Sequence, residues 1–426
     1  MKTFFLAEKI ALTYCVGIGL LTLEMAALSL LGIKFSIVSL TVCIALLIAA
    51  VLWVTHRSDR SRAPLKEQPL SRLEKFFILG ISFEVLYAFF RTLIMPMESY
   101  DGIAIYALKS KIFYLARSIP HDFFSSFRDI VPHVEYPLLI PLAETAFYTF
   151  LGSVNDLLVK IIFPLYYLSL IMVFYSVSRR FISRRQSLLF TFFLATIPQI
   201  TDFATNGYAD LPFAFYCSAA IFYLYLWITQ KKDPFLILSF ILSVLAVWTK
   251  SEGLMFALVN AAVVIVYMAR EKSVYVKGCI YAAVMVAMAA SYMLILRLLG
   301  LAVNSDFIHS QSSLPVRLIT GIERIPAILY EYQIQFFGPK RWNIIWILFI
   351  AGFFIGFKRI FSKDMFPLTA AIILIFLGYS AVYMLSSAPQ GFGWHLSTSG
   401  SRLFIHFVPI VALWLVLLFK KMELDV

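Results

Sequence analysis

Residues 76–94 read FFILGISFEVLYAFFRTLI. As a helix, this run is long enough to cross the hydrocarbon core of a bilayer, which takes roughly 20 apolar residues. The next residues, 95–102, read MPMESYDG and open a long polar interruption of an otherwise apolar chain. Ionisable side chains beside lipid are energetically costly and are therefore functional candidates. We interpret Asp101 as the leading catalytic candidate and the rest of the chain as its scaffold.

The composition predicts an integral membrane protein. Of the 426 residues, 61% are hydrophobic and 14% are charged, whereas soluble domains are about 45–50% apolar and about 25% charged. The formal net charge is +12. The basic residues are spread over the gaps between apolar runs and do not form one basic face, which argues against nucleic acid as a partner. All four cysteines fall inside apolar runs, where we expect small buried side chains and no disulfide framework.

The apolar runs predict an all-α, polytopic membrane protein with about twelve transmembrane helices, outer-face loops and juxtamembrane helices. No strand-like alternation competes with this interpretation. We expect one transmembrane domain over residues 1–426, with an extra N-terminal helix hairpin at 10–54. The expected spans are 10–30, 34–54, 75–94, 157–178, 187–203, 211–229, 234–249, 254–269, 278–298, 342–357, 365–385 and 403–420.

The charged loops determine the expected topology, because cytoplasmic loops are rich in Lys and Arg. The basic loops fall on one side only if 137–152, a short segment containing Pro137 and Pro141, lies along the outer surface without crossing. Both termini are then cytoplasmic, 95–156 is the first large outer loop with surface helices, and 299–341 is a second outer segment. The expected inner basic residues are Arg57, Arg60, Arg62, Lys66, Arg72, Arg179, Arg180, Arg184, Arg185, Lys231, Lys232, Arg270, Lys272, Lys277, Lys358, Arg359, Lys363, Lys420 and Lys421.

Two acids on the expected outer side are the catalytic candidates. Asp101 could act as a general base on an incoming hydroxyl or as a metal ligand. Alternatively, Ser99 and Asp101 cap the helix that follows. Asp210 stands directly before Leu211-Pro212 at the mouth of a span, where capping is the stronger local explanation. Its expected position on the same face as Asp101 makes it a candidate.

Basic residues in two outer turns are candidates for binding an anion. Lys250 lies on the outer side, against the charge rule, and Glu252 follows within one turn. The pair could grip an anionic lipid head group, or it could be a snorkelling lysine with its counter-ion. His395 and Arg402 lie in a stretch with several hydroxyl side chains, which suits a phosphate cradle. The alternative for Arg402 is a simple interfacial anchor.

Motifs for metals and nucleotides are missing from the sequence. There is no close-spaced His/Cys cluster of the zinc-binding type, and neither a Walker-type phosphate loop nor a dinucleotide fingerprint. We therefore predict no dedicated metal site, no organic cofactor and no nucleotide-driven transport. A divalent cation held by the acids remains an option.

The order of these features resembles that of the polytopic GT-C glycosyltransferases, especially the branch with protein O-mannosyltransferases and the bacterial aminoarabinose transferase of lipid A. Asp101 matches the family's acid in the first large outer loop, and Glu135-Tyr136-Pro137 matches the opening of its surface helix. Asp210-Leu211-Pro212 matches its second acid before a proline, and 249–253 matches its Thr-Lys-x-x-Gly turn. The segment 394–402 resembles that of bacterial relatives.

Two features depart from the family pattern. Glu135 and Tyr136 stand where the aminoarabinose branch has a phosphate-contacting lysine before its prolines, and only one adjacent proline follows here. The hairpin 10–54 precedes the family's usual first helix. Both departures leave the donor and the acceptor open.

The resemblance implies transfer of a sugar from a polyprenyl-phosphate donor to a hydroxyl of a lipid, glycan or protein, on the outer side of a bacterial plasma membrane. Asp101 would deprotonate the acceptor on the opposite face of the sugar, which implies inversion. Basic residues would neutralise the departing phosphate, and the other acids would orient these partners or hold a divalent cation. The implied catalytic residues are Asp101 and Asp210, and the implied substrate-binding residues are Lys250, Glu252, His395, Arg402, Lys109 and Tyr136.

Three other classes of protein are alternatives. A secondary transporter or lipid-linked glycan flippase would have a similar number of spans, but it would favour ionisable residues near the bilayer midplane and helices broken in matching halves. A transferase of the O-antigen-ligase type would also use outer-loop His and Arg. A non-catalytic assembly subunit would leave the clustered charges unexplained.

Overall fold

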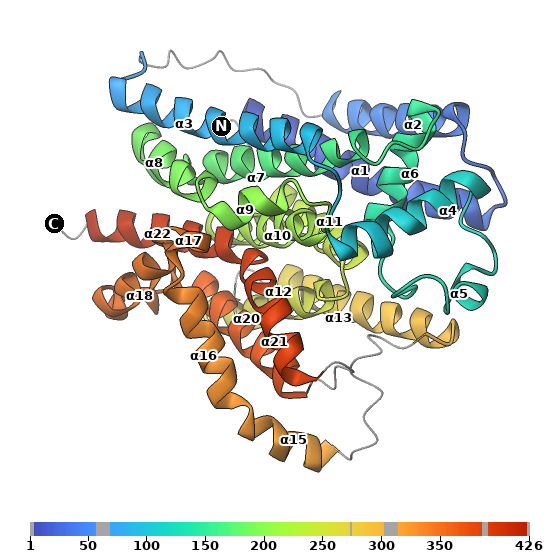
Figure 1. Cartoon of the computed structure of the whole chain (residues 1–426). Coiled ribbons are helices and arrows are strands. Elements are labelled where there is room, and N and C mark those ends of the chain that lie inside the picture. Colours follow the sequence, from blue (N-terminus) through green and yellow to red (C-terminus); the bar gives the residue numbers. More distant parts are fainter. Residues whose placement is uncertain (1–3, 57–68, 273–274, 302–313, 386–390, 424–426) are drawn as a thin grey trace. The chain divides into compact units, whose positions relative to one another are not determined.

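The computed structural model describes residues 4–56, 69–272, 275–301, 314–385 and 391–423. All regular elements in these ranges are helices, with no strand among them (Figure 1). This confirms the predicted all-α class. The chain forms two compact units. The N-terminal unit contains Met1–Arg179, Ser183–Ala195 and Thr201–Ala209, and the C-terminal unit contains Arg180–Ile182, Thr196–Ile200 and Asp210–Val426.

Some predictions concern residues outside these described ranges. They include part of the second outer segment, at 302–313, and residues 386–390, which begin the expected outer segment 386–402 that carries His395 and Arg402. They also include the inner-loop basic residues Arg57, Arg60, Arg62 and Lys66.

The N-terminal unit packs α1 against α7, α3 against α7 and α8, and α4 against α6. A capping box starts α3, because Ser71 Oγ accepts from the Glu74 N–H and Glu74 Oε2 accepts from the Ser71 N–H. Arg184 of α8 donates its Nε–H to Glu74 Oε1 at 2.7 Å, which fixes α8 to the start of α3. The helices of this unit are α1 (Leu6–Leu30), α2 (Ile37–His56), α3 (Arg72–Ile94), the π-helix η1 (Asp101–Ala107), α4 (Leu108–Ala116), α5 (Phe123–Ser126), α6 (Leu139–Leu151), the 3-10 helix η2 (Leu158–Ile161), α7 (Ile162–Ser178) and α8 (Arg184–Ala195).

The C-terminal unit is arranged around α10, whose apolar residues are buried on every side. An antiparallel hairpin joins α10 to α11 through Lys231, which has a left-handed φ of 56°. The helices of this unit are α10 (Asp210–Gln230), α11 (Asp233–Thr249), α12 (Gly253–Met268), α13 (Tyr275–Leu298), α15 (Leu314–Glu323), α16 (Ile325–Phe336), α17 (Pro339–Trp342), α18 (Ile345–Ile355), α19 (Phe357–Ile360), α20 (Phe366–Leu385), α21 (Phe392–Ile405) and α22 (Val408–Glu423).

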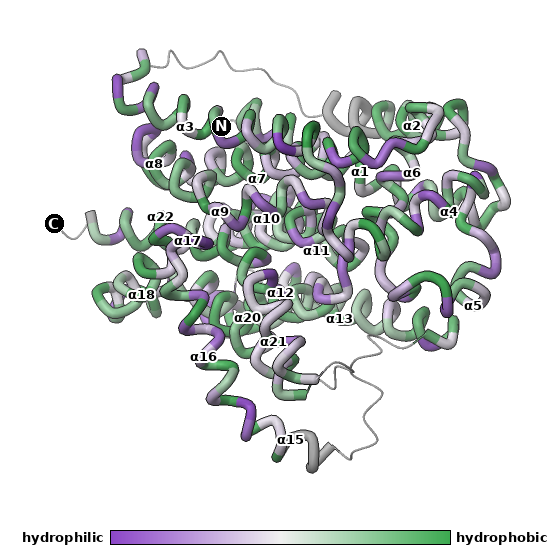
Figure 2. The backbone as a smooth tube through the Cα atoms, in the orientation of Figure 1, coloured by the Kyte–Doolittle hydropathy of each residue, from purple (hydrophilic) through white to green (hydrophobic). Residues whose placement is uncertain are grey.

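Within the described residues, six helices are long and apolar enough to cross a membrane, or seven if α21 and α22, bent by 45°, form one span. Figure 2 shows that hydrophobic residues dominate these helices. The fold is thus that of a helical protein suited to a membrane, and the expectation of about twelve spans remains a prediction. The six long helices are α1, α3, η2 with α7, α10, α13 and α20.

Five expected spans correspond to shorter helices. The spans at 234–249, 254–269 and 342–357 correspond to α11, α12 and α18, which have 11–17 residues, and the span at 34–54 corresponds to α2, whose fully described part is Ile37–Ala49. In place of one continuous helix over 187–203, the structure has α8 and then α9 (Pro198–Phe203). Pro198 explains this break, because proline has no N–H to donate and disfavours a helical residue before it.

The segment 95–156, predicted to be the first large outer loop, contains the short helices η1, α4, α5 and α6. The expectation that α6 lies along the outer surface of the membrane without crossing it stays a prediction. Within the N-terminal unit, most residues of α6 are buried, and it packs against α1 and α4. Its sequence is apolar on more than one face, so burial on both sides is favourable.

Candidate functional site

Hairpin geometry brings together two of the predicted site residues. Asp210 is the first residue of α10, and Lys250 directly follows the last residue of α11. Because the two helices are antiparallel and joined at their other ends, these residues meet at the open end of the hairpin. Lys250 Nζ lies 3.0 Å from Asp210 Oδ1 and 3.1 Å from Glu252 Oε1.

The bend between α21 and α22 adds two more side chains. Arg402 lies in the last turn of α21, and His406 follows it four residues later, on the same helix face. Arg402 Nη2 lies 3.0 Å from Asp210 Oδ2, and His406 Nε2 lies 3.0 Å from Asp210 Oδ1. The other ring nitrogen of His406, Nδ1, lies 2.7 Å from the Tyr379 hydroxyl. We call Asp210, Lys250, Glu252, Tyr379, Arg402 and His406 the Asp210 cluster.

The side chains of this cluster differ in how far they are buried. The side chains of Asp210 and His406 are fully buried, and that of Lys250 is 7% exposed. Arg402 is 21% exposed and Glu252 is 30% exposed, so these two are the members that a molecule from outside can reach. When the imidazole of the cluster's histidine is neutral, the positive charges of its lysine and arginine balance the negative charges of its two carboxylates. A buried ion cluster of this kind is stable only when each charge keeps its partners.

The two charged groups in the turn between α11 and α12 have shifted pKa values. Burial opposes the charge of Lys250, but the carboxylates of Asp210 and Glu252 outweigh it and raise the pKa of Lys250. Burial likewise opposes ionisation of Glu252, but the nearby charge of Lys250 outweighs it and lowers the pKa of Glu252. Both groups are therefore charged at neutral pH.

Aromatic rings hold the cluster in position. The ring of Phe213, on α10, lies edge-on to His406 with a centroid distance of 4.6 Å. Phe404, two residues after Arg402, contacts Trp346 of α18 at 4.9 Å and Phe376 of α20 at 5.8 Å. Because such pairs add to the apolar burial, the end of α21 that carries Arg402 is firmly packed.

Gly253 allows the tight turn that presents Lys250 and Glu252. A Cβ atom at this position would lie 2.5–2.6 Å from backbone atoms of Ala246 and Val247. These atoms belong to α11 and cannot move without shifting the helix.

Gly253→Ala is therefore expected to destabilise the protein by roughly 1–3 kcal/mol, the usual cost of overpacking. The melting temperature of the purified protein in detergent is the measurement. Gly393→Ala is the matched control, because nothing lies within 4 Å of a Cβ built there. Equal melting temperatures for both variants would contradict the close contact.

Asp101 begins η1, which is a π-helix of seven residues. Helices of this type are rare and often occur at functional sites. The cap at this turn comes from Ser99, whose Oγ accepts from the Gly102 N–H at 3.2 Å and donates to the Asn206 carbonyl at 2.5 Å. Asp101 is half-buried and belongs to the N-terminal unit, whereas the Asp210 cluster belongs to the C-terminal unit.

Lys109 and Tyr136, both predicted to bind substrate, lie together in the N-terminal unit. Lys109 Nζ donates to the His133 carbonyl at 2.5 Å and lies 5.8 Å from the centroid of the Tyr136 ring. Tyr136 stacks on the ring of His133 at 4.4 Å, and His133 Nδ1 lies 3.2 Å from Glu135 Oε1. Burial lowers the pKa of Lys109 to about 7, against the opposing charge of Glu135.

His395 lies on α21, seven residues before Arg402, or roughly 10 Å along the helix axis. Its ring is edge-on to Tyr383 at 5.3 Å, and its carbonyl accepts from Ser399 Oγ at 2.6 Å. The structure therefore gives His395 a different environment from that of Arg402.

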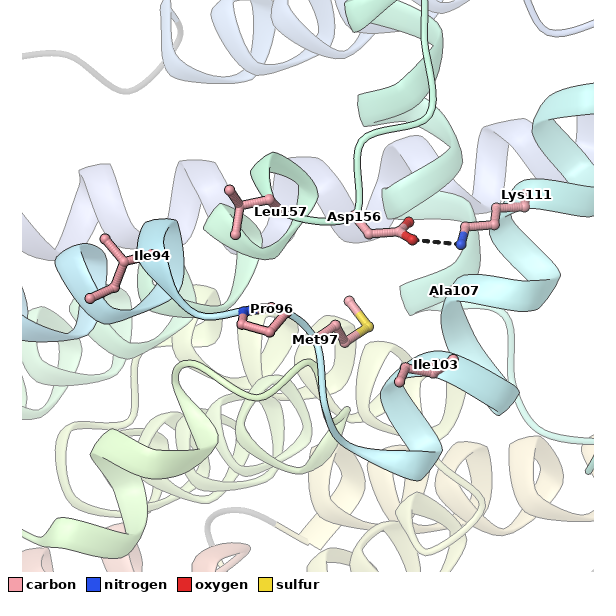
Figure 3. Close-up of a pocket in the computed structure, with 8 residues that line it drawn as sticks. All are labelled: Ile94, Pro96, Met97, Ile103, Ala107, Lys111, Asp156 and Leu157. Carbon is pink, nitrogen blue, oxygen red and sulfur yellow. Dashed lines mark hydrogen bonds and ion pairs between the residues drawn. The ribbon is translucent and has the colours of Figure 1, made fainter.

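A cavity of about 440 Å³ lies beside η1 in the N-terminal unit. Figure 3 shows Lys111, on α4, pointing toward Asp156, and their Nζ and Oδ2 atoms are 2.6 Å apart. Most of the remaining wall is apolar, formed by residues such as Ile94, Met97 and Ile103 (Figure 3). An apolar wall with one ion pair suits an amphipathic molecule.

Glu144, on α6, is a fully buried acid of the same unit. Neither of its carboxyl oxygens has a hydrogen-bond partner within the described part of the chain. Burial raises its pKa to about 8 from an ordinary value of 4.5. The side chain is therefore mainly protonated at pH 7.

The native pKa of Glu144 lies above its unfolded value, so folding stability should fall as the pH rises from 4.5 toward 8. The loss is on the order of 3 kcal/mol at pH 7. Glu144→Gln should abolish this decline, measured as the melting temperature between pH 5 and pH 7. The lowered pKa of Lys109 makes folding stability rise with pH, and this effect falls mainly above pH 7. Glu98→Gln, at an exposed acid, is the control; an unchanged slope in Glu144→Gln would contradict the assignment.

Metal binding has no ready-made site among the described residues: no group of three or more His, Cys, Asp or Glu side chains is placed to hold an ion. The oxygens of Asp210 instead face the cations of Lys250 and Arg402.

Two members of the cluster, His406 and Tyr379, were not predicted as site residues. The sequence did carry a signal for His406. It follows Arg402 by four residues, and residues at this spacing share a helix face. Tyr379 lies within an apolar run, and nothing in the sequence pattern indicates that it contacts His406.

No protein-family model matches this chain. No curated protein matches its sequence either. The functional proposal therefore depends on the geometry above and on the family resemblance of the motifs.

Proposed function

We propose that this protein is an integral-membrane glycosyltransferase that moves a sugar from a polyprenyl-phosphate donor to an acceptor hydroxyl, with inversion. The observation that carries the proposal is the Asp210 cluster. A fully buried carboxylate holds Lys250, Arg402 and His406 at about 3 Å, at the end of a hairpin of apolar helices. Among the cations of this cluster, Arg402 is the more accessible to a ligand.

The cluster suits a phosphate leaving group. As the bond between the sugar carbon and the phosphate oxygen breaks, the electron pair stays on the phosphate, whose negative charge grows. A guanidinium group binds such an anion with two parallel hydrogen bonds, and Lys250 adds a second positive charge. Asp210 would act as a positioning residue, because it is buried and keeps both cations in place until the phosphate arrives.

The proposed base is Asp101. It would take the proton of the acceptor hydroxyl as the acceptor oxygen forms its bond to the sugar carbon. Attack on the face opposite the phosphate inverts the configuration. The apolar cavity beside η1 suits an amphipathic ligand, and Lys109 and Tyr136 are proposed substrate contacts of the same unit.

The proposed location is a bacterial plasma membrane with the Asp210 cluster on the outer side and both chain termini in the cytoplasm. The supporting observation is the charge of the C-terminal unit. Lys231 and Lys232 follow the end of α10, and Lys420 and Lys421 lie at the end of α22, so both pairs stand at the end away from the cluster. Loops rich in Lys and Arg favour the cytoplasmic side.

The experiment is a donor panel. Purified protein in lipid nanodiscs is incubated with radiolabelled polyprenyl-phosphate sugars and membrane-extract acceptors, and labelled sugar is followed from donor to acceptor. Protein-dependent transfer from at least one donor is expected. If no member of a broad panel is used, the transferase proposal fails.

A secondary transporter or flippase is the second candidate, and one observation favours it. Asp210, His406 and Tyr379 form a buried chain of hydrogen bonds, and such chains relay protons in transporters. Flux of a labelled lipid-linked sugar across sealed vesicles, without transfer to an acceptor, would favour this candidate over the enzyme.

A further inference from the structure

A second cavity, of about 260 Å³, lies in the C-terminal unit, away from the Asp210 cluster. Tyr225 and Thr229 contribute from the last turns of α10, and Lys420 and Lys421 contribute from the last turn of α22. Its wall is completed in part by Phe181 and Asp364. We call it the basic-end cavity.

The position of this cavity at the ends of two apolar helices suits a membrane interface. Both α10 and α22 begin beside the Asp210 cluster, pack against each other and end at the basic-end cavity. Apolar helices of this length end where the hydrocarbon region gives way to lipid head groups. The rings of Phe181 and Tyr225 lie 5.6 Å apart on its wall, and aromatic side chains are enriched at this depth.

The charge of the cavity is positive. Its lining carries two lysines and one carboxylate. Lys421 Nζ lies 3.6 Å from Asp364 Oδ2, and both side chains are partly exposed, at 33% and 68%. Lys420 Nζ lies 5.6 Å from the centroid of the Phe181 ring and forms no ion pair with any acid in the described ranges.

The surroundings add to this positive charge. Two nearby acids of the same unit are already paired, since Asp233 binds Lys277 at 2.6 Å and Glu271 binds Lys363 at 2.7 Å. The remaining basic residues in the turns and helices at this end are Arg180, Lys231, Lys232, Arg270, Lys272, Lys358 and Arg359, and one further acid, Glu423, ends α22. An anion that enters the cavity therefore meets a positive field and no surplus of acids.

We propose that the basic-end cavity binds the phosphate of an anionic phospholipid head group through Lys420 and Lys421. Basic pockets between membrane helices bind acidic head groups in this way, with each lysine adding affinity. The volume of about 260 Å³ is below that of pockets for whole drug-sized ligands. It suits a phosphoglycerol head group, with the acyl chains lying along the apolar helices. The proposal does not depend on the transferase function.

The test is the retention of lipid by purified protein in native mass spectrometry, with phosphatidylglycerol and phosphatidylcholine in competition. We expect preferential retention of phosphatidylglycerol, weakened roughly fivefold by Lys420→Gln and roughly 25-fold by the Lys420→Gln/Lys421→Gln double variant. Lys358→Gln, which removes the same charge from an exposed site at the same end, should change retention little.

Asp364→Asn is a variant that should strengthen lipid retention, whereas the lysine variants should weaken it. It removes the carboxylate that competes for Lys421, so retention of phosphatidylglycerol should rise by a few-fold. A variant that binds more tightly cannot be explained by misfolding. Unchanged or weaker retention would overturn the proposal.

Three other outcomes would also overturn it. Equal retention of the two lipids would mean that the cavity has no charge preference. Equal losses in Lys358→Gln and in the double variant would mean that only the general surface charge matters. If glycerol 3-phosphate in solution displaces the lipid and binds the wild type with the same lysine dependence, the ligand is a free phosphate ester and not a lipid.

Discussion

Arg402→Gln is expected to slow sugar transfer by roughly 10²–10³-fold, the usual loss when one donor to a developing oxyanion is removed. The physical reason is that the guanidinium group of Arg402 can donate two parallel hydrogen bonds to the leaving phosphate. In the structure this group faces Asp210 with Nη2 at 3.0 Å, and it is the more exposed cation of the cluster. The rate of transfer in nanodiscs, with saturating donor, is the measurement.

Two variants make this result interpretable. Arg402→Lys keeps the charge but loses the paired hydrogen bonds, so a partial recovery of rate is expected. Arg341→Gln removes an exposed arginine of α17 in the same unit and should be silent. If Arg402→Gln transfers sugar as fast as Arg341→Gln, then Arg402 does not contact the leaving phosphate.

Asp101→Asn is expected to lower the rate of the chemical step by roughly 10²–10⁴-fold, because an amide cannot accept the acceptor's proton. Donor affinity should be nearly unchanged, since the base acts on the acceptor. The fold should survive the change. The capping hydrogen bond to the Gly102 N–H comes from the Ser99 hydroxyl, and Asp101 itself is only half-buried. Single-turnover transfer and donor binding, measured on the same preparation, separate the two effects.

Glu98→Gln is the matched control for Asp101→Asn, because Glu98 is an exposed acid three residues earlier. It should retain the wild-type rate. Equal rates for Asp101→Asn and the wild type, with donor still turned over, would leave the transferase in place and remove Asp101 as its base.

Much of the polar part of the candidate site could be predicted from the sequence. Asp210, Lys250, Glu252 and Arg402 stand out because each is ionisable and lies next to an apolar run, where such groups are costly. Their contact at about 3 Å follows from the antiparallel α10–α11 hairpin and the bend after α21. Neither the hairpin nor the bend has a local sequence signal from which the distances between these side chains could be predicted.

Other features depend on packing between distant segments. Tyr379 joins the cluster only because α20 packs beside α22. His395 has the chemistry of a phosphate contact, but its place on α21 puts it beside Tyr383. Glu144 is buried because α6 packs against α1 and α4, a contact that the short segment with two prolines does not indicate. The break before Pro198, by contrast, had a clear sequence signal.

The most direct test of the central claim is the affinity of the protein for polyprenyl monophosphate. This compound is the product left by every polyprenyl-phosphate sugar, so its binding can be measured before the sugar is known. Titration into nanodiscs holding wild type, Arg402→Gln or Arg341→Gln should show binding that is at least tenfold weaker in Arg402→Gln alone, as expected for a charge-assisted pair. Equal affinity in all three proteins, or no binding by the wild type, would contradict the assignment of the Asp210 cluster as a phosphate site.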